Sequence, residues 1–445
     1  MKTFEIAYRR RLPVRHDVDV FIAGGGPAGL AAATTAARQG AKVFLAESLG
    51  AFGGVGTSAG VPSFGRLTDG VNFVSSGFAS EVYERLWKEG GAGPDMRKEH
   101  PDEMFFIFDP ECLKRAYDSI AQDARFEFSF NTSLIDVEVA GGNVEHAICA
   151  AKSGVFAVRA KVFIDASGDG DLAVMAGASF AKGDAEGMMQ PGTLCSLWAG
   201  VEWSRIKSSA EQLLPKAFGK GVFSIEDRHL PGILHSGDYA SWGNVGHTFG
   251  VDGTDERSVT KALIWGRKLV LEYERFHRDF VPGCEKAKML LTAQTLGIRE
   301  TRRIKGDYEL NLDDFMRRAV FEDEIGRFSY PVDVHSSKPD DTAYESFADV
   351  YEKLRYAPGE NYGIPYRSLL PLGLRNVLVA GRCISVDRMM LGSIRVMPAC
   401  FITGQAAGMA AGMAAASGRS LRELDVKSLQ RSLLATGAYL PNCKE

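Results

Sequence analysis

The first fifty residues of the chain alternate between apolar and helix-forming segments. Residues 18–23 form a short apolar run, residues 28–39 have the period of a buried helix that Gly40 ends, and residues 42–46 form a second apolar run. This order predicts a βαβ unit. A βαβ unit at this position places the chain in the α/β class, with a doubly wound, Rossmann-like parallel sheet.

The pattern after this unit predicts a longer series of elements. A Gly-, Ser- and Thr-rich stretch without a clean period indicates a long loop, and loops of this length usually carry function. Two strand patterns separated by a Gly-Gly-Asn turn indicate a β-hairpin. The predicted elements are the loop 49–77, helices 80–89 and 110–124, hairpin strands 127–139 and 144–152, strands 155–164 and 376–380, and a buried helix within 396–418.

The character of the chain changes near residue 181. Four of the five tryptophans lie between residues 181 and 356, and charged helices such as 261–276 alternate there with strand patterns. We therefore expect an α+β capping domain, 181–356, inserted into a discontinuous first domain made of residues 1–180 and 357–445.

Composition and charge exclude several classes of protein. The 445 residues are 45% hydrophobic and 24% charged, which is typical of a folded chain and not of a disordered one. The net charge of −4 disfavours a protein that coats nucleic acid. No apolar segment follows the N-terminal arginines, and the seven cysteines contain no CxxC pair, so we expect a cytoplasmic protein without a redox dithiol. Residues 396–418 lack leucine and contain Pro398, so they favour a buried helix over a membrane span.

The sequence GGGPAG at 24–29 has the GxGxxG spacing of a dinucleotide-binding turn. It follows a predicted strand and opens a predicted helix, and Glu47 follows Gly24 by 23 residues. In such a turn Gly24 permits the sharp bend, Gly26 lets the backbone approach a pyrophosphate, and Gly29 lets helix and strand pack closely. The helix N-terminus attracts the phosphates, and a carboxylate such as Glu47 accepts hydrogen bonds from a ribose diol. The alternative is a glycine-rich turn that binds nothing.

Further stretches decide between FAD and NAD. Apolar strands end in glycine at FIDASGDGDLA (163–173) and at NVLVAGRCIS (376–385), and the chain also contains GGVGT (53–57), GIRETRRIKGDY (297–308) and GSIRVMPACFITGQAAGMAA (392–411). With the fingerprint at 24–47, these motifs make the chain resemble the FAD-dependent oxidoreductases of the glutathione-reductase-like Rossmann superfamily. More narrowly, it resembles bacterial flavoproteins distantly related to fumarate reductases. The resemblance spans nearly the whole chain and implies FAD as cofactor.

The resemblance also implies positions for the cofactor. The first helical turn, including Ala28, would face the pyrophosphate, and Val137 would hold the adenine edge through its backbone. Many relatives have an acidic residue where this chain has Arg382. The 396–418 helix would be the last helix of the chain and would begin at the flavin. The N–H groups at its start would stabilise the reduced ring. The expected cofactor-binding residues are Gly24, Gly26, Ala28, Gly29, Glu47, Gly53, Gly54, Thr57, Val137, Ala166, Gly168, Asp169, Gly381, Arg382, Arg395, Val396 and Met397.

Candidates for chemistry beyond the flavin are arginines and one histidine. Arg299 and Arg302 are expected either to bind a substrate carboxylate or supply a proton, or to form structural ion pairs with Glu300, Asp307 or Asp313. Arg388 occupies a region where relatives often have a histidine. His247 is a candidate acid–base group because imidazole titrates near neutrality, and a buried structural histidine is the alternative.

No metal site is predicted, because His229, His235, His277 and His335 have no ligand spacing around them. The sequence therefore predicts a FAD-dependent oxidoreductase of the dehydrogenase or reductase type. It would transfer a hydride between a small-molecule substrate and flavin N5, with an external electron donor or acceptor and neither nucleic acid nor membrane as partner. A flavin-dependent monooxygenase and a non-catalytic FAD-binding protein are the alternatives.

Overall fold

The protein is described from a computed structural model that covers residues 6, 9–93, 103–207, 209–229, 232–237 and 239–443. The parallel sheet predicted from the first fifty residues is present. Strand β1 (Val14–Ala23) pairs in parallel with β2 (Val43–Ala46) on one side and with β6 (Gly154–Asp165) on the other. Helix α1 (Pro27–Arg38) connects β1 to β2, as the predicted βαβ unit requires.

The sheet continues in both directions from these strands. Its order is β3-β2-β1-β6-β5-β4, and β15 (Val377–Val379) also pairs in parallel with the carboxyl half of β6. The long β6 therefore belongs to two pairings. Its first half continues the antiparallel meander of β4 (Ser133–Ala140) and β5 (Asn143–Ala151), and its second half lies within the parallel sheet.

The predicted hairpin strand 127–139 is wrong, because it is two strands in different places. Residues Glu127–Ser129 form β3, which pairs in parallel with β2 at the far edge of the sheet. Asn131 then adopts a left-handed backbone with φ of 50°, which breaks the extended run. Only β4 forms the antiparallel pair with β5.

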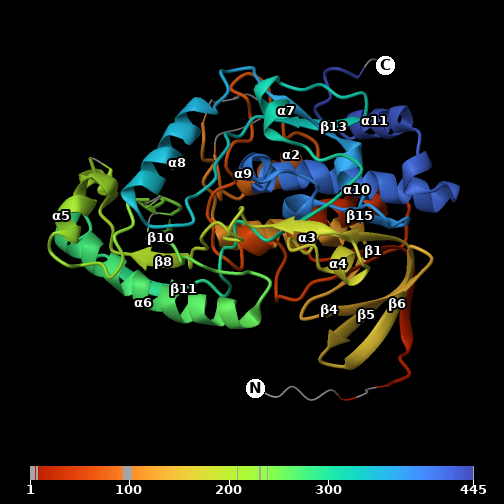
Figure 1. The fold of residues 1–445 in the computed structure, drawn as a ribbon, viewed down its shortest axis with the longest axis horizontal. Coiled ribbons are helices and arrows are strands. Elements are labelled where there is room, and N and C mark those ends of the chain that lie inside the picture. Colours follow the sequence, from red (N-terminus) through yellow and green to blue (C-terminus); the bar gives the residue numbers. More distant parts are fainter. Residues whose placement is uncertain are drawn as a thin grey trace.

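Helices α1 and α10 (Met397–Ser417) pack closely against each other beside the sheet (Figure 1). A Cβ atom at Gly404 would lie 2.2 Å from the Ala28 carbonyl oxygen, and one at Gly408 would lie 2.2 Å from that of Ala32. The glycines are thus required by backbone contact. The expectation that α10 is the last helix is wrong, because α11 (Val426–Ala435) follows it.

Among the described residues, α10 is the one helix long and apolar enough to cross a membrane, and 83% of its apolar window is buried inside the protein. This burial agrees with the predicted core helix. The other elements of this part of the molecule are α2 (Phe78–Lys88), α3 (Pro110–Ala124), α4 (Asp171–Met175), β7 (Phe180–Lys182), β12 (Arg302–Ile304), α7 (Leu312–Met316), β13 (Glu324–Phe328), β14 (Tyr362–Pro365) and α9 (Arg388–Ile394).

A second body lies beside the first, at the left of Figure 1, and has hydrophobic cores of its own. Its antiparallel sheet has the order β11-β8-β10-β9, and the 25-residue helix α6 packs Val270, Tyr273 and Phe276 into its core. Its elements are β8 (Ser196–Ala199), α5 (Leu214–Phe218), β9 (Gly232–Ile233), β10 (Ala240–Asn244), α6 (Glu256–Phe280) and β11 (Lys288–Thr292), with α8 (Asp341–Lys353) alongside.

The two cores divide the predicted inserted domain. Residues that pack together in the second body lie between Leu194 and Leu296. Ile304, Phe328 and Tyr330, by contrast, belong to the large core that contains the parallel sheet. The separately packed part of the cap is therefore shorter than the predicted range 181–356.

Candidate functional site

Four of the predicted cofactor segments meet at one edge of the parallel sheet. Glu47 follows β2, Gly24 follows β1, Ala166 follows β6, and Gly381 follows β15, so all four stand at the carboxyl ends of neighbouring strands. In open α/β sheets ligands bind in the crevice outside these ends. The fold thus gathers segments that are up to 357 residues apart in sequence.

Glu47 anchors the glycine turn. Its buried carboxylate accepts a hydrogen bond from the Gly25 N–H at 2.6 Å and another from the Leu49 N–H at 2.7 Å. Oε1 also accepts from the Ser48 hydroxyl at 3.3 Å, whereas Oε2 retains a further lone pair that can accept from a ribose hydroxyl. The acidic residue therefore shapes the turn in addition to its predicted role in binding a ribose.

The three glycines of the GxGxxG turn have different structural roles. Gly24 has φ of 94°, and a Cβ there would lie 2.6 Å from the Ala166 carbonyl oxygen. At Gly29 a Cβ would lie 1.8 Å from the Gly24 carbonyl oxygen, which confirms close packing as its role. Gly26 has an ordinary extended backbone, with φ of −65°, and a Cβ there would meet nothing within 4 Å.

The space in front of Gly26 tests whether FAD fits. Gly54, in the predicted flavin-side loop, faces it: the nearest atom to a Cβ at Gly54 is the Gly26 Cα, at 3.6 Å. Helix α1 starts at Gly26 without a side-chain cap, so its first N–H groups are available to phosphate oxygens. Two glycines facing open space beside an uncapped helix N-terminus fit a bound pyrophosphate.

The flavin-side loop lies against the start of α10. The Thr57 hydroxyl donates to the Phe52 carbonyl at 2.6 Å, and Gly53 has φ of 103° beside the ring of Tyr117. Helix α10 begins at Met397, whose sulfur would lie 2.8 Å from a Cβ at Gly56, and Val396 gives it no side-chain cap. The start of α10 therefore contacts this loop, and the direction of its first N–H groups toward the flavin stays a prediction.

Arg382 holds two segments together. Its Nε donates to the Gly168 carbonyl at 2.9 Å, one terminal nitrogen pairs with Asp169 at 2.5 Å, and the other donates to the Ile298 carbonyl. The guanidinium therefore joins the 166–171 turn to the cap. This contact explains a basic residue where many relatives have an acidic one, while contact of Arg382 with the cofactor stays a prediction.

Val137 is half-buried on β4, and its N–H donates to the Asp136 side chain at 2.8 Å. Its predicted contact with adenine is not tested by this geometry and stays a prediction. Ala28 and Ala166 are both buried, and Ala28 lies beside Gly381.

The structure separates the two candidate arginines of the GIRETRR motif. Arg299 is buried and donates to the Pro191 carbonyl and the Thr193 hydroxyl, each at 2.9 Å. Arg302 points elsewhere, pairing with Asp171 at 2.6 Å and donating to the Asp169 carbonyl. The expected partners Asp307 and Asp313 belong to neither. The two guanidinium groups therefore lie in different surroundings.

A buried carboxylate between them has arginine partners of its own. Glu300 pairs with Arg303 at 2.5 Å and accepts from Arg388 Nε at 3.3 Å. It also accepts the Gln190 N–H at 3.1 Å. Arg388 thus contacts a structural acid, and its role in catalysis stays a prediction.

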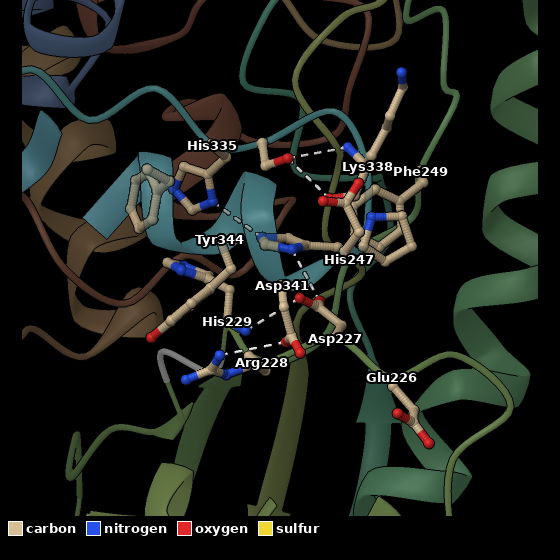
Figure 2. A pocket seen from close by; sticks show the side chains of 14 residues that line it. Glu226, Asp227, Arg228, His229, His247, Phe249, His335, Lys338, Asp341 and Tyr344 are labelled. Atoms are coloured by element: carbon tan, nitrogen blue, oxygen red, sulfur yellow. Dashed lines mark hydrogen bonds and ion pairs between the residues drawn. The ribbon is translucent and has the colours of Figure 1, made fainter. Parts of the chain in front are cut away.

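His247 lies in a continuous row of polar contacts. Its Nδ1 is 2.9 Å from Asp227, and its Nε2 is 3.0 Å from Nδ1 of His335 (Figure 2). His335 Nε2 is in turn 3.1 Å from Asp333, which pairs with Arg395 at 3.1 Å. Burial lowers the pKa of His247 and, more strongly, that of His335. Both ring nitrogens of His247 have partners, and its proposed acid–base role stays a prediction.

Arg395 and Arg299 lie close enough to influence each other. Burial, together with the charge of Arg395, lowers the pKa of Arg299 to about 10. Within the described part of the chain, the buried Arg395 Nε and Gln190 Nε2 have no hydrogen-bond partner. Gln190 was not predicted, because an isolated glutamine carries no motif, and its position depends on contacts with the distant Glu300 and His335.

Several solved structures are similar to this chain at low sequence identity. A geranylgeranyl bacteriochlorophyll reductase-like protein of Thermoplasma acidophilum is 14% identical, with 95% of this chain and 87% of that one covered, at a TM-score of 0.45. A myxobacterial chondrochloren halogenase is 12% identical over 94% and 78%, at 0.47. A p-nitrophenol 4-monooxygenase of Pseudomonas putida is 11% identical over 95% and 89%, at 0.45.

Among curated proteins, a dihydrolipoyl dehydrogenase of Trypanosoma brucei brucei is 35% identical over 89 residues, which are 20% of this chain and 18% of that protein. Residues 19–433 match the family described as FAD dependent oxidoreductase. This match covers the parallel sheet, the glycine turn, the cap and α10. The chain therefore belongs to the FAD dependent oxidoreductase family, and its cofactor is FAD.

Proposed function

We propose that this protein is a FAD-dependent dehydrogenase or reductase that transfers a hydride between a carbon atom of a small anionic substrate and the flavin. Bound FAD supplies a two-electron donor and acceptor. The chain supplies the binding of the substrate's charge. The observation that carries the proposal is a buried group of donors between cap and sheet, formed by Arg299, Arg395 and Gln190.

The electrostatics of this group favour an anion. Burial and the nearby charge of Arg395 lower the pKa of Arg299, so a negative charge placed beside Arg299 is favourable. Arg395 Nε and Gln190 Nε2 are buried without acceptors, and burying an unsatisfied donor costs free energy. A carboxylate supplies several acceptor lone pairs at once and is bound bidentately by guanidinium.

The segment that leads to Arg299 contacts the end of the flavin-side loop. The Gln294 N–H donates to the Ser58 carbonyl at 3.0 Å. Thr301 then contacts Asp169 at 2.8 Å. These contacts support a substrate pocket between residues 294–301 and the carboxyl edge of the sheet.

The electron partner is proposed to be external, because the sequence has a single dinucleotide fingerprint and no CxxC pair. An anaerobic screen tests the whole proposal. The oxidised protein is mixed with carboxylic acids bearing an oxidisable carbon, and the reduced protein with unsaturated or keto acids, while the flavin absorbance is followed. Each acid is paired with its uncharged amide as a control.

We expect at least one acid, and not its amide, to bleach or restore the flavin colour. Reduction only by NAD(P)H in the presence of an aromatic compound would instead identify a monooxygenase. A flavin that no donor reduces and no acceptor reoxidises would identify a non-catalytic FAD protein. Either result would overturn the proposal.

A further inference from the structure

Three histidines from distant parts of the sequence converge in the cap. His229 precedes β9, His247 follows β10, and His335 follows β13. One ring nitrogen of each lies within 4.8 Å of the others, and the three rings line a common pocket (Figure 2). No short spacing in the sequence announces this cluster, which is why no metal site was predicted.

Two of the rings are oriented by carboxylates on their outer sides. Asp227 faces Nδ1 of His247 at 2.9 Å, and Asp333 faces Nε2 of His335 at 3.1 Å. Histidines that ligate a metal characteristically donate their other N–H to a carboxylate, which fixes the tautomer and directs the free lone pair at the ion. Here a carboxylate lies at ion-pair distance from the outer nitrogen of each of two neighbouring rings.

The inner nitrogens of these two rings then need a cation between them. When each neutral ring donates its proton outward to a carboxylate, Nε2 of His247 and Nδ1 of His335 both present lone pairs. These two atoms are only 3.0 Å apart.

The dimensions suit a small ion. Two imidazole nitrogens bound to one tetrahedral zinc at about 2.0–2.1 Å are separated by about 3.3 Å, so the present gap has to widen only slightly. The pocket beside the rings has a cavity of about 20 Å³, which is room for one water molecule. His229 stacks on His247 with ring planes 15° apart, so its ring has to turn to direct a nitrogen at the same point.

Acidic and basic side chains lie around the cluster in nearly equal number. Asp227 and Asp333 are the acids in contact with the rings, and Arg395 shares Asp333. Arg299 contributes a further positive charge to this region. The pocket is also lined by Arg228, Lys338, Glu226, Asp340 and Asp341.

We propose that His229, His247 and His335 bind one divalent transition-metal ion of the zinc class, with a water molecule in the fourth position. Three imidazoles plus an open position form a ligand set that such metals accept. The test of this site is separate from that of the proposed hydride transfer, because its occupancy is measured without any substrate.

The test uses the FAD-loaded full chain after treatment with a chelator. Titration with Zn²⁺ is followed by calorimetry, and Co²⁺ is added separately so that its visible absorption, at wavelengths beyond the flavin bands, reports the geometry. We expect one ion per chain, an intense tetrahedral Co²⁺ spectrum, and displacement of Co²⁺ by Zn²⁺.

Variants separate this site from adventitious binding. His229→Ala, His247→Ala and His335→Ala should each weaken Zn²⁺ binding by about 100-fold or more, and Asp333→Asn by about 10–100-fold through the orientation of His335. His146→Ala is the matched control, since His146 lies on the exposed meander and pairs with Glu138. FAD content and melting temperature identify variants that remain folded, and half-buried His229 is the substitution with the smallest structural cost.

Absence of stoichiometric binding would overturn the proposal and leave the two inner nitrogens sharing a proton. Binding that survives in His229→Ala and His335→Ala would show an adventitious ion only. An octahedral, weakly absorbing Co²⁺ spectrum would likewise contradict a three-histidine site.

Discussion

At the scale of single residues, Gly26 makes the sharpest prediction. Its backbone is extended and a Cβ there meets no protein atom, so Gly26→Val should fold normally. The valine would instead occupy the space assigned to the pyrophosphate and weaken FAD binding by about 100-fold or more. Measured FAD content and the melting temperature of the apoprotein check both parts.

Gly219→Val is the matched control, because Gly219 also has an ordinary φ of −61° and lies exposed in the cap. It should retain full FAD occupancy. Equal occupancy in Gly26→Val and Gly219→Val would remove the glycine turn from the cofactor site.

The two arginines of the GIRETRR motif should behave differently. Arg299→Ala removes a buried donor beside the proposed substrate and should lower turnover by about 100–1000-fold, with FAD content unchanged. Arg302→Ala breaks a partly exposed pair with Asp171 and should instead cost about 1 kcal/mol of stability and lower FAD affinity. Turnover, FAD content and melting temperature measured on both variants distinguish these outcomes, and identical profiles would contradict the separation.

Asp165 makes a prediction about pH. Burial raises the pKa of this carboxyl to about 6, although it accepts hydrogen bonds from Ser167 and from the Ala173 N–H. The folded state holds this proton more tightly than the unfolded chain. The contribution of Asp165 to the free energy of unfolding is therefore complete below about pH 4 and is lost as the pH rises through 6. The total loss is on the order of 3 kcal/mol.

Asp165→Asn should remove this pH dependence of the unfolding free energy between pH 4 and 7. The difference in unfolding free energy between wild type and variant should therefore narrow as the pH rises. The variant should also be less stable by about 1–3 kcal/mol at low pH, since an amide presents a donor where Ala173 needs an acceptor. Parallel curves of unfolding free energy against pH would show that Asp165 does not titrate in this window.

At the scale of elements, the close contact between α1 and α10 requires glycine, which has no side chain, at the positions where the two backbones meet. Gly408→Ala would place a methyl group against the Ala32 carbonyl and should destabilise the protein by about 1–3 kcal/mol, despite the better helix propensity of alanine. Gly412→Ala is the control in the same helix, because the nearest atom to its new methyl group is the Gln39 Cβ at 3.2 Å, a much looser contact than that at Gly408. Denaturant unfolding compares them, and an equal or larger cost at Gly412 would contradict backbone contact as the cause.

At the scale of the whole molecule, two separate cores predict an uneven response to FAD. The ligand binds only the folded sheet domain and should stabilise it by about 2.7 kcal/mol at 100 times its dissociation constant. Hydrogen exchange should therefore slow in β1, β2, β6 and the start of α10 when FAD is added to the apoprotein. Peptides from the centre of α6, which packs in the second core, serve as the control. Equal protection in both would show that the cores unfold as one unit.

The resemblance of motifs spread over nearly the whole chain indicated the cofactor, while the sequence by itself determined the βαβ unit, the glycine turn and the buried character of α10. These features are local: glycine spacing, apolar runs and one acidic residue lie within a few dozen positions of one another, and each reflects a backbone requirement that neighbouring residues satisfy. The predicted strand 127–139 failed for the same reason, since its local pattern is strand-like throughout while its two halves pair with different partners.

Only the tertiary structure decided which charged and imidazole groups meet. Arg299 and Arg302 are three residues apart yet end in different surroundings, while His229, His247 and His335 meet across more than a hundred residues. Contacts of this kind depend on how the cap folds back on the carboxyl edge of the sheet. A side chain's neighbours there come from segments with no shared period or spacing, so nothing in the linear pattern records them.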